Sequence, residues 1–169
     1  MKSVLLILGM VVFLFVSCAN DQDNTGERAE KEWNNFIQKH LIGEWKPESI
    51  TIKPVLGAPV IEKSYASMNA TEDKVVLNID YTGYFKTSLD AEQPKTIHFK
   101  WYPKLDELGI IGNDEVEFKG IILHKSAQEL VVALPLQDVL PYLKPYIQEL
   151  NHLNAVEIEA LVVNFRFVK

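Results

Sequence analysis

The sequence predicts a single all-β domain of seven to nine short antiparallel strands, with one helix before the strands and another before the last strand. After Gly43, apolar and polar residues alternate with a period of two in short segments. Turn-forming residues separate these segments. So many short strands in one modest domain close into a barrel or stack as a sandwich, because both arrangements manage exposed sheet edges.

The first 17 residues are expected to be a signal peptide. Met1-Lys2 gives a short positive start, and an apolar run follows from Val4 to Val16. The run is shorter than the roughly 20 apolar residues of a membrane-spanning helix. Residues 18–26 are polar and are expected to form a flexible tether.

Phe15-Val16-Ser17-Cys18 resembles the lipobox of bacterial lipoproteins. The resemblance implies cleavage before Cys18 and attachment of acyl chains such as palmitate to it, with the domain outside the cytoplasm. Cys18 is the only cysteine, so lipidation would also account for an odd thiol in an exported chain. The alternative is an ordinary signal peptide in which Cys18 is incidental.

Charge and length restrict the partners of the remaining chain. Without residues 1–17 it has 16 basic and 23 acidic residues, a formal net charge of −7. That balance disfavours nucleic acid as a partner. It also means that membrane attachment would depend on the acyl chains rather than on a basic patch. The length suits one domain, here residues 27–169.

Residues 27–42 are expected to form an amphipathic helix, since Trp33, Phe36, Ile37 and Leu41 recur at three- and four-residue spacing. Strands are expected from Gly43 and over residues 74–81, 85–87, 96–102, 115–119, 120–125, 129–134 and 160–167, with a tight turn at 81–84. A second helix is expected to begin near Lys144 or Pro145 and to run to Asn151, because Pro141 and Pro145 are tolerated only in a first helical turn. This helix would cap a barrel end or act as a lid.

Leu41-Ile42-Gly43-Glu44-Trp45 and Arg166 resemble the lipocalin pattern, in which a G-x-W motif opens the first strand and an arginine lies in the last. The wider resemblance is to lipocalin-like lipoproteins of Gram-negative bacteria and covers residues 41–169. It implies an eight-stranded up-and-down barrel, in which Arg166 packs across the ring of Trp45 at the closed end. Such a cation over an indole contributes about 0.5–2 kcal/mol.

Six aromatic residues fall on strand faces that are expected to point inward: Phe85, Phe99, Trp101, Phe118, Phe165 and Phe167. They would line a cavity for a flat or greasy ligand or fill a solid core. A barrel of about eight strands can do either.

Catalytic and metal-binding patterns are not found. The four histidines lack H-E-x-x-H spacing, no glycine-rich phosphate loop follows a strand, and no G-x-S-x-G occurs. His98 and His124 could meet across a sheet. Asp106-Glu107 and Asp114-Glu115 could bracket a calcium loop, but a solvated acidic hairpin loop is the favoured interpretation. We expect no cofactor, no metal and no enzymatic activity.

The leading functional hypothesis is non-catalytic binding of a small hydrophobic molecule by a lipid-anchored envelope protein, with the outer membrane favoured and the domain in the periplasm or facing outside. The alternative is an envelope interaction or assembly module with a filled barrel. In that case its loops, its outer face or a helix over residues 144–151 would dock a protein partner.

Overall fold

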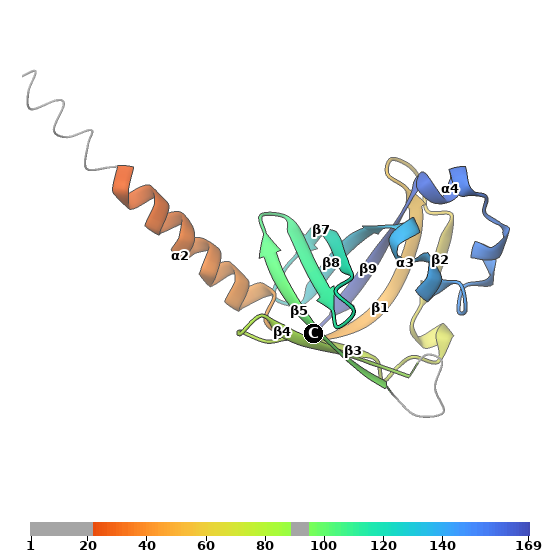
Figure 1. Ribbon diagram of the computed structural model, residues 1–169, viewed down its shortest axis with the longest axis horizontal. Coiled ribbons are helices and arrows are strands. Elements are labelled where there is room, and N and C mark those ends of the chain that lie inside the picture. Colours follow the sequence, from red (N-terminus) through yellow and green to blue (C-terminus); the bar gives the residue numbers. More distant parts are fainter. Residues whose placement is uncertain (1–21, 89–94) are drawn as a thin grey trace, which may run out of the picture. The chain divides into compact units, whose positions relative to one another are not determined.

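The computed structural model describes residues 22–88 and 95–169 (Figure 1). The chain divides into two compact units between Gln38 and Lys39, and each is described by itself. The predicted signal peptide and Cys18 lie outside the described residues. Within the described part of the chain, no helix is both long enough and apolar enough to cross a membrane.

The first described element is the helix α2 (Gln22–His40). The predicted helix over residues 27–42 is therefore present, but it begins five residues earlier. Residues 22–26 of the expected tether are helical. Lys39 and His40 lie in the last turn, where positive charge is favoured.

The second unit is built on nine antiparallel strands. They are β1 (Gly43–Pro54), β2 (Ile61–Ser64), β3 (Lys74–Leu77), β4 (Thr82–Thr87), β5 (Lys95–Lys104), β6 (Glu107–Gly112), β7 (Glu117–Lys125), β8 (Glu129–Pro135) and β9 (Leu161–Val168). Four short helical elements complete it: η1 (Ala66–Met68), α3 (Leu136–Leu143), η2 (Gln148–His152) and α4 (Ala155–Glu159).

The strands form a closed barrel. From β3 to β9 each strand pairs with the next, and β9 pairs back onto β1. Strands β2 and β3 pair with the same edge of β1, β2 at residues 49–52 and β3 at residues 43–45. Together they therefore take the place of one strand in the barrel. With β2 and β3 counted as one strand position, the barrel has eight strands in up-and-down order, which confirms the predicted architecture.

A bulge in β1 sets which of its residues face inward. The register shifts between Pro47 and Ser49. Trp45 and Pro47 are buried before the shift, and Ile50 and Ile52 are buried after it. A strict period of two would turn Ile50 outward, so the bulge keeps both halves of this long strand on the core.

The structure corrects the predicted acidic loop. Residues 107–112 form the strand β6, with Leu108 buried on the inner face. Gly109 and Gly112 hid the alternation in the sequence, and Gly109 is required because the Tyr102 ring lies where a Cβ would be. The strands expected at 115–119 and 120–125 are one strand, β7. The turn expected at 81–84 lies at 78–82, where the Tyr81 amide donates to the Asn78 carbonyl.

The helix expected from Lys144 or Pro145 to Asn151 is displaced. The helix α3 ends before Pro145 and contains Pro141, only the short η2 falls in the expected range, and α4 directly precedes β9. The lost hydrogen bond at Pro141 costs about 3 kcal/mol. Burial of Leu136, Val139 and Leu143 offsets this cost, at about 1.5–3 kcal/mol for each side chain.

Candidate functional site

The interior of the barrel is the candidate site, and the six predicted aromatic residues all lie on the inner face of its wall. Phe85 pairs in register with Val75 and Ile97, and Phe118 pairs with Ile110 opposite Trp101. Phe165 and Phe167 share the inner face of β9 with buried Leu161 and Val163. Phe99 lies over Gly83, whose added Cβ would clash with its ring. The predicted inward faces are therefore correct.

The six aromatic residues do not form one continuous surface. Phe99 and Trp101 are buried, whereas the other four are only half-buried. The rings of Phe165 and Phe167 stack with centroids 6.4 Å apart. Phe118 instead meets Tyr142 of α3 edge to face, at 5.9 Å.

One end of the barrel, called here the closed end, is sealed by two indoles. It carries the β3–β4, β5–β6 and β7–β8 connections. Trp45 and Trp101 are each 1% exposed. Trp45 Nε1 donates to the Leu41 carbonyl at 2.8 Å, and Trp101 Nε1 donates to the Thr82 carbonyl at 2.9 Å. Both buried polar groups are therefore satisfied.

The cation over Trp45 is Lys169, not Arg166 as the lipocalin resemblance implied. Lys169 Nζ lies 4.4 Å from the ring centroid and donates to the Ile42 carbonyl at 3.1 Å. Burial lowers the pKa of this lysine. Arg166 lies on the outer face of β9, where its Nε donates to Glu129 at 2.8 Å and its guanidinium also pairs with Glu48. Alternation along β9 forbids a contact between Arg166 and an inward-facing Trp45.

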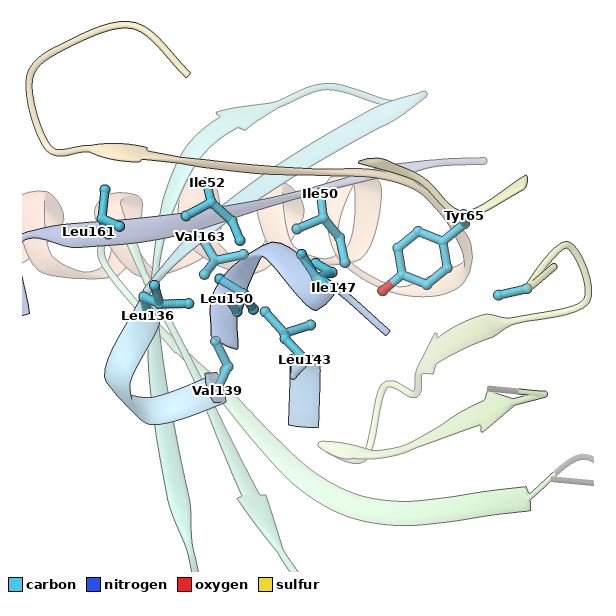
Figure 2. Packing of buried hydrophobic residues seen from close by; sticks show 11 residues of the cluster. Ile50, Ile52, Tyr65, Leu136, Val139, Leu143, Ile147, Leu150, Leu161 and Val163 are labelled. Atoms are coloured by element: carbon cyan, nitrogen blue, oxygen red, sulfur yellow. The ribbon is translucent and has the colours of Figure 1, made fainter. Parts of the chain in front are cut away.

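The opposite end, called the mouth, carries the β1–β2, β6–β7 and β8–β9 connections. The segment from α3 to η2 packs there on the inner face of the wall (Figure 2). Its buried side chains are Leu136, Val139, Leu143, Ile147 and Leu150. They share one cluster with Ile50 and Ile52 of β1 and with Leu161 and Val163 of β9.

This segment covers only part of the mouth. Among the described residues, the cluster draws strand residues from β1, β2, β7, β8 and β9 and none from β3, β4 or β5. On the β3–β5 wall, Val75 and Phe85 are half-buried and Ile97 is 49% exposed, although all three face inward. We call these three residues the open wall. Apolar side chains that face inward and remain in contact with water are a surface for an apolar ligand.

A buried carboxylate fixes the edge of the open wall. Asp73, before β3, is 2% exposed and accepts hydrogen bonds from Thr87 Oγ1 at 2.8 Å and from the Ser88 amide and hydroxyl at 2.7 and 2.8 Å. These bonds join the start of β3 to the end of β4.

Burial, together with the Asp73 charge, raises the pKa of the Tyr65 phenol, so this tyrosine stays protonated.

Comparison with known proteins gives little beyond this geometry. No family model and no curated protein matches the chain. Among solved structures, the chain is similar to the bovine odorant binding protein deswapped triple mutant, with 13% identity and a TM-score of 0.38. That match covers 75% of this chain and 72% of the other. The functional argument therefore rests on the barrel itself.

The polar groups considered in the sequence as metal ligands or as a histidine pair do not come together in the described residues. No group of three or more His, Cys, Asp or Glu side chains in that part of the chain could hold a metal ion. His98 and His124 do not meet across neighbouring strands, since β6 lies between β5, which carries His98, and β7, which carries His124. Two open hollows of about 400 and 440 Å³ lie on the described part of the chain. The first is lined by residues that include Lys63 and His152, and the second by residues that include Lys104 and Ile121. None of the six aromatic residues lines either hollow.

Sequence reasoning missed Ile97 of the open wall and Asp73, which supports its edge. Ile97 shares a strand face with Phe99 and Trp101, so the alternation signalled its inward position, but only the aromatic residues were selected. Asp73 gave no signal in the sequence, because its hydrogen bonds come from residues 14 and 15 positions away.

Proposed function

We propose that the protein is a lipid-anchored, non-catalytic binding protein that holds a small hydrophobic molecule against the open wall. The observation that carries the proposal is the water contact of Val75, Phe85 and Ile97 on the inner face of an otherwise closed barrel. The ligand would lie between these residues and the α3–η2 segment.

Contact with the open wall would use the hydrophobic effect alone. Removing about 200 Å² of apolar surface from water contributes about 5 kcal/mol, before the cost of association is subtracted. The open wall offers two aliphatic side chains and one phenyl ring, so it favours a flat or aliphatic molecule over a charged one. The closed end contributes no surface, because its indoles are sealed.

The anchor is proposed from the sequence. Acylation of Cys18 would hold the domain at a membrane of the cell envelope, most simply the outer membrane, on the side away from the cytoplasm. We expect intact protein from its own host to carry the mass of the acyl groups. The Cys18→Ser variant should move from the membrane to the soluble fraction. A wild-type chain with unmodified Cys18 would overturn the anchor without affecting the binding proposal.

Native mass spectrometry and lipid extraction of the protein from its own host's envelope test the binding proposal first. We expect a stoichiometric small apolar molecule to co-purify. A clean apo mass, combined with no response to a panel of fatty acids, haem and isoprenoids, would contradict the proposal.

A pair of isoleucine variants then locates the site. Ile97→Arg places a charge on the open wall, whereas Ile121→Arg places one on the outer face of β7, at a comparable 55% exposure. We expect Ile97→Arg to weaken binding of the fluorescent probe N-phenyl-1-naphthylamine at least tenfold and Ile121→Arg to leave it unchanged. Equal effects of the two variants would place the ligand elsewhere.

A second candidate is an envelope interaction module, and the β1–β2 loop favours it. Residues 55–60 contain no polar side chain and are all exposed, with Leu56 at 91%. Docking through residues 144–151 is not supported, because Ile147 and Leu150 are buried in the core. Loss of a specific protein cross-link in Leu56→Ser, with probe binding intact, would favour this module.

A further inference from the structure

A buried phenol without a hydrogen-bond partner lies at the break between β2 and β3. Tyr65 directly follows β2 and is 6% exposed. No group of the described residues forms a hydrogen bond with its hydroxyl. Buried tyrosine hydroxyls usually have a partner, and an unpaired one is unfavourable. Packing therefore accounts for an aromatic ring at this position but not for its hydroxyl.

The backbone holds this ring on the inner face of the barrel. The Tyr65 amide donates to the Glu48 carbonyl at 3.0 Å. Lys63 pairs with buried Ile50, and the alternation of β2 places Tyr65 on the same face two residues later. Figure 2 shows the phenol oxygen directed toward Ile147 of the α3–η2 segment. The hydroxyl thus points into the interior rather than to solvent.

The hydroxyl lies where the α3–η2 segment meets the open wall. On one side, Tyr65 belongs to the same buried cluster as Leu143 and Ile147 of the segment. On the other side, Asp73 is close enough for its charge to act on the phenol. Asp73 precedes Val75 of the open wall by two residues, which is about 7 Å along an extended strand. A molecule held between the segment and the open wall would therefore have one end at the Tyr65 hydroxyl.

The charges around the hydroxyl favour a neutral ligand. The raised pKa keeps the Tyr65 phenol protonated, so it can donate a hydrogen bond. Both oxygens of the buried Asp73 carboxylate accept hydrogen bonds from the end of β4. Lys63, on the same inner face, is paired with Glu149 of η2. A carboxylate ligand would therefore meet the charge of Asp73 without Lys63 as a free counter-ion.

We propose that the Tyr65 hydroxyl donates a hydrogen bond to the ligand, and that the ligand is a neutral apolar molecule with a carbonyl or hydroxyl oxygen at one end. The inference rests on the proposed binding at the open wall and specifies the class of molecule bound there. A ketone, ester or alcohol would pair with the buried donor. A hydrocarbon would leave it unpaired in apolar surroundings, which disfavours binding.

Three naphthalenes with different substituents test the inference on the chain from Ala19 onward, which contains every described residue. The ligands 2-acetylnaphthalene, 2-ethylnaphthalene and 2-naphthoate present a ketone, a hydrocarbon and a carboxylate. Their dissociation constants are measured by displacement of N-phenyl-1-naphthylamine from the wild type, Tyr65→Phe and Tyr84→Phe. Tyr84 is the matched control, because it carries the same hydroxyl on the outer face of β4, where its ring lies near that of His98. Each ligand is compared with itself across the variants, so its own hydration cancels.

We expect Tyr65→Phe to weaken binding of 2-acetylnaphthalene about fivefold or more and not to weaken binding of 2-ethylnaphthalene. Tyr84→Phe should change neither. Equal effects of Tyr65→Phe on the ketone and the hydrocarbon, or no effect on either, would overturn the inference and leave binding at the open wall intact. A larger loss for 2-naphthoate than for the ketone would assign the hydroxyl to an anionic ligand and overturn the neutral class. Displacement by none of the three ligands would overturn the proposed function together with the inference.

Thermal unfolding without ligand separates a binding role of the hydroxyl from a structural one. Tyr65→Phe removes only the hydroxyl and keeps the ring in the cluster. An unpaired hydroxyl contributes no hydrogen bond to the fold, so we expect the melting temperature to stay unchanged or to rise. A melting temperature lowered by several degrees would assign the hydroxyl to a structural bond and would also overturn the inference.

Discussion

The two ends of the barrel are filled by different means. At the closed end, the wall's own side chains Trp45 and Trp101 fill the interior and satisfy their N–H groups on backbone carbonyls. At the mouth, a separate segment from α3 to η2 lies against part of the wall (Figure 2). Side chains of a continuous wall seal it all round, whereas an inserted segment covers only the strands that its apolar residues face. Both ends therefore bury apolar side chains, but the mouth is the end at which part of the inner face stays uncovered.

The largest expected effect is at the closed end. Trp45→Ala should lower the free energy of unfolding by about 3–5 kcal/mol, because a fully buried indole leaves a cavity. Trp45→Phe should cost less, about 1–3 kcal/mol, mainly through the unpaired Leu41 carbonyl. Denaturant unfolding followed by circular dichroism measures both variants. Unfolding midpoints equal to that of the wild type would show that Trp45 does not seal this end.

At the mouth, Leu143→Ala should cost about 2–5 kcal/mol and also open the site. Removing this buried side chain loosens the α3–η2 segment, so we expect the association rate of N-phenyl-1-naphthylamine to rise in stopped-flow mixing. Gln137→Ala, an exposed change on the same helix, should alter neither quantity. Trp45→Phe should lower stability without changing the rate. A faster association in Trp45→Phe than in Leu143→Ala would reverse the assignment of the two ends.

Asp73→Ala tests the support of the open wall. It leaves the Thr87 hydroxyl and the Ser88 amide without their acceptor, so a loss of about 1–3 kcal/mol is expected. Hydrogen exchange should rise at the end of β4 and remain low near Trp45. Protection lost equally at both ends would mean that Asp73 supports the whole barrel rather than its mouth.

The sequence revealed the local features of the fold better than its long-range ones. Alternation with a period of two placed Phe85, Phe118 and Phe165 on the inner face, because strand geometry alone decides that question. Strand β6 was missed, since Gly109 and Gly112 interrupt its alternation of apolar and polar residues. The reason for Gly109 is visible only in the structure, where the Tyr102 ring occupies the place of a Cβ. The start of α3 was misplaced, because burial at three positions outweighs the cost of Pro141.

The candidate site depended on tertiary structure to a greater degree. The six aromatic residues were predicted, but the open wall follows from which strands the α3–η2 segment leaves uncovered, and no local pattern encodes that. The bulge between Pro47 and Ser49 likewise fixes how β1 and β9 align. Without this register, the partner of Trp45 could not be deduced from spacing.

The smallest expected effect distinguishes the two cations of the closed end. Lys169→Met removes the ammonium above Trp45 and its bond to Ile42, so a loss of about 0.5–1 kcal/mol and a change in tryptophan emission are expected. Arg166→Met removes outer-face ion pairs with Glu48 and Glu129 and should leave the emission unchanged. The hydrogen bond from Arg166 lowers the carboxyl pKa of Glu129. Lowering the pH through that pKa should therefore remove the stabilisation by the Glu129–Arg166 pair. The contact of Lys169 with Trp45 should not change. An emission change in Arg166→Met alone would restore the arginine to the ring and would require β9 to be shifted by one residue.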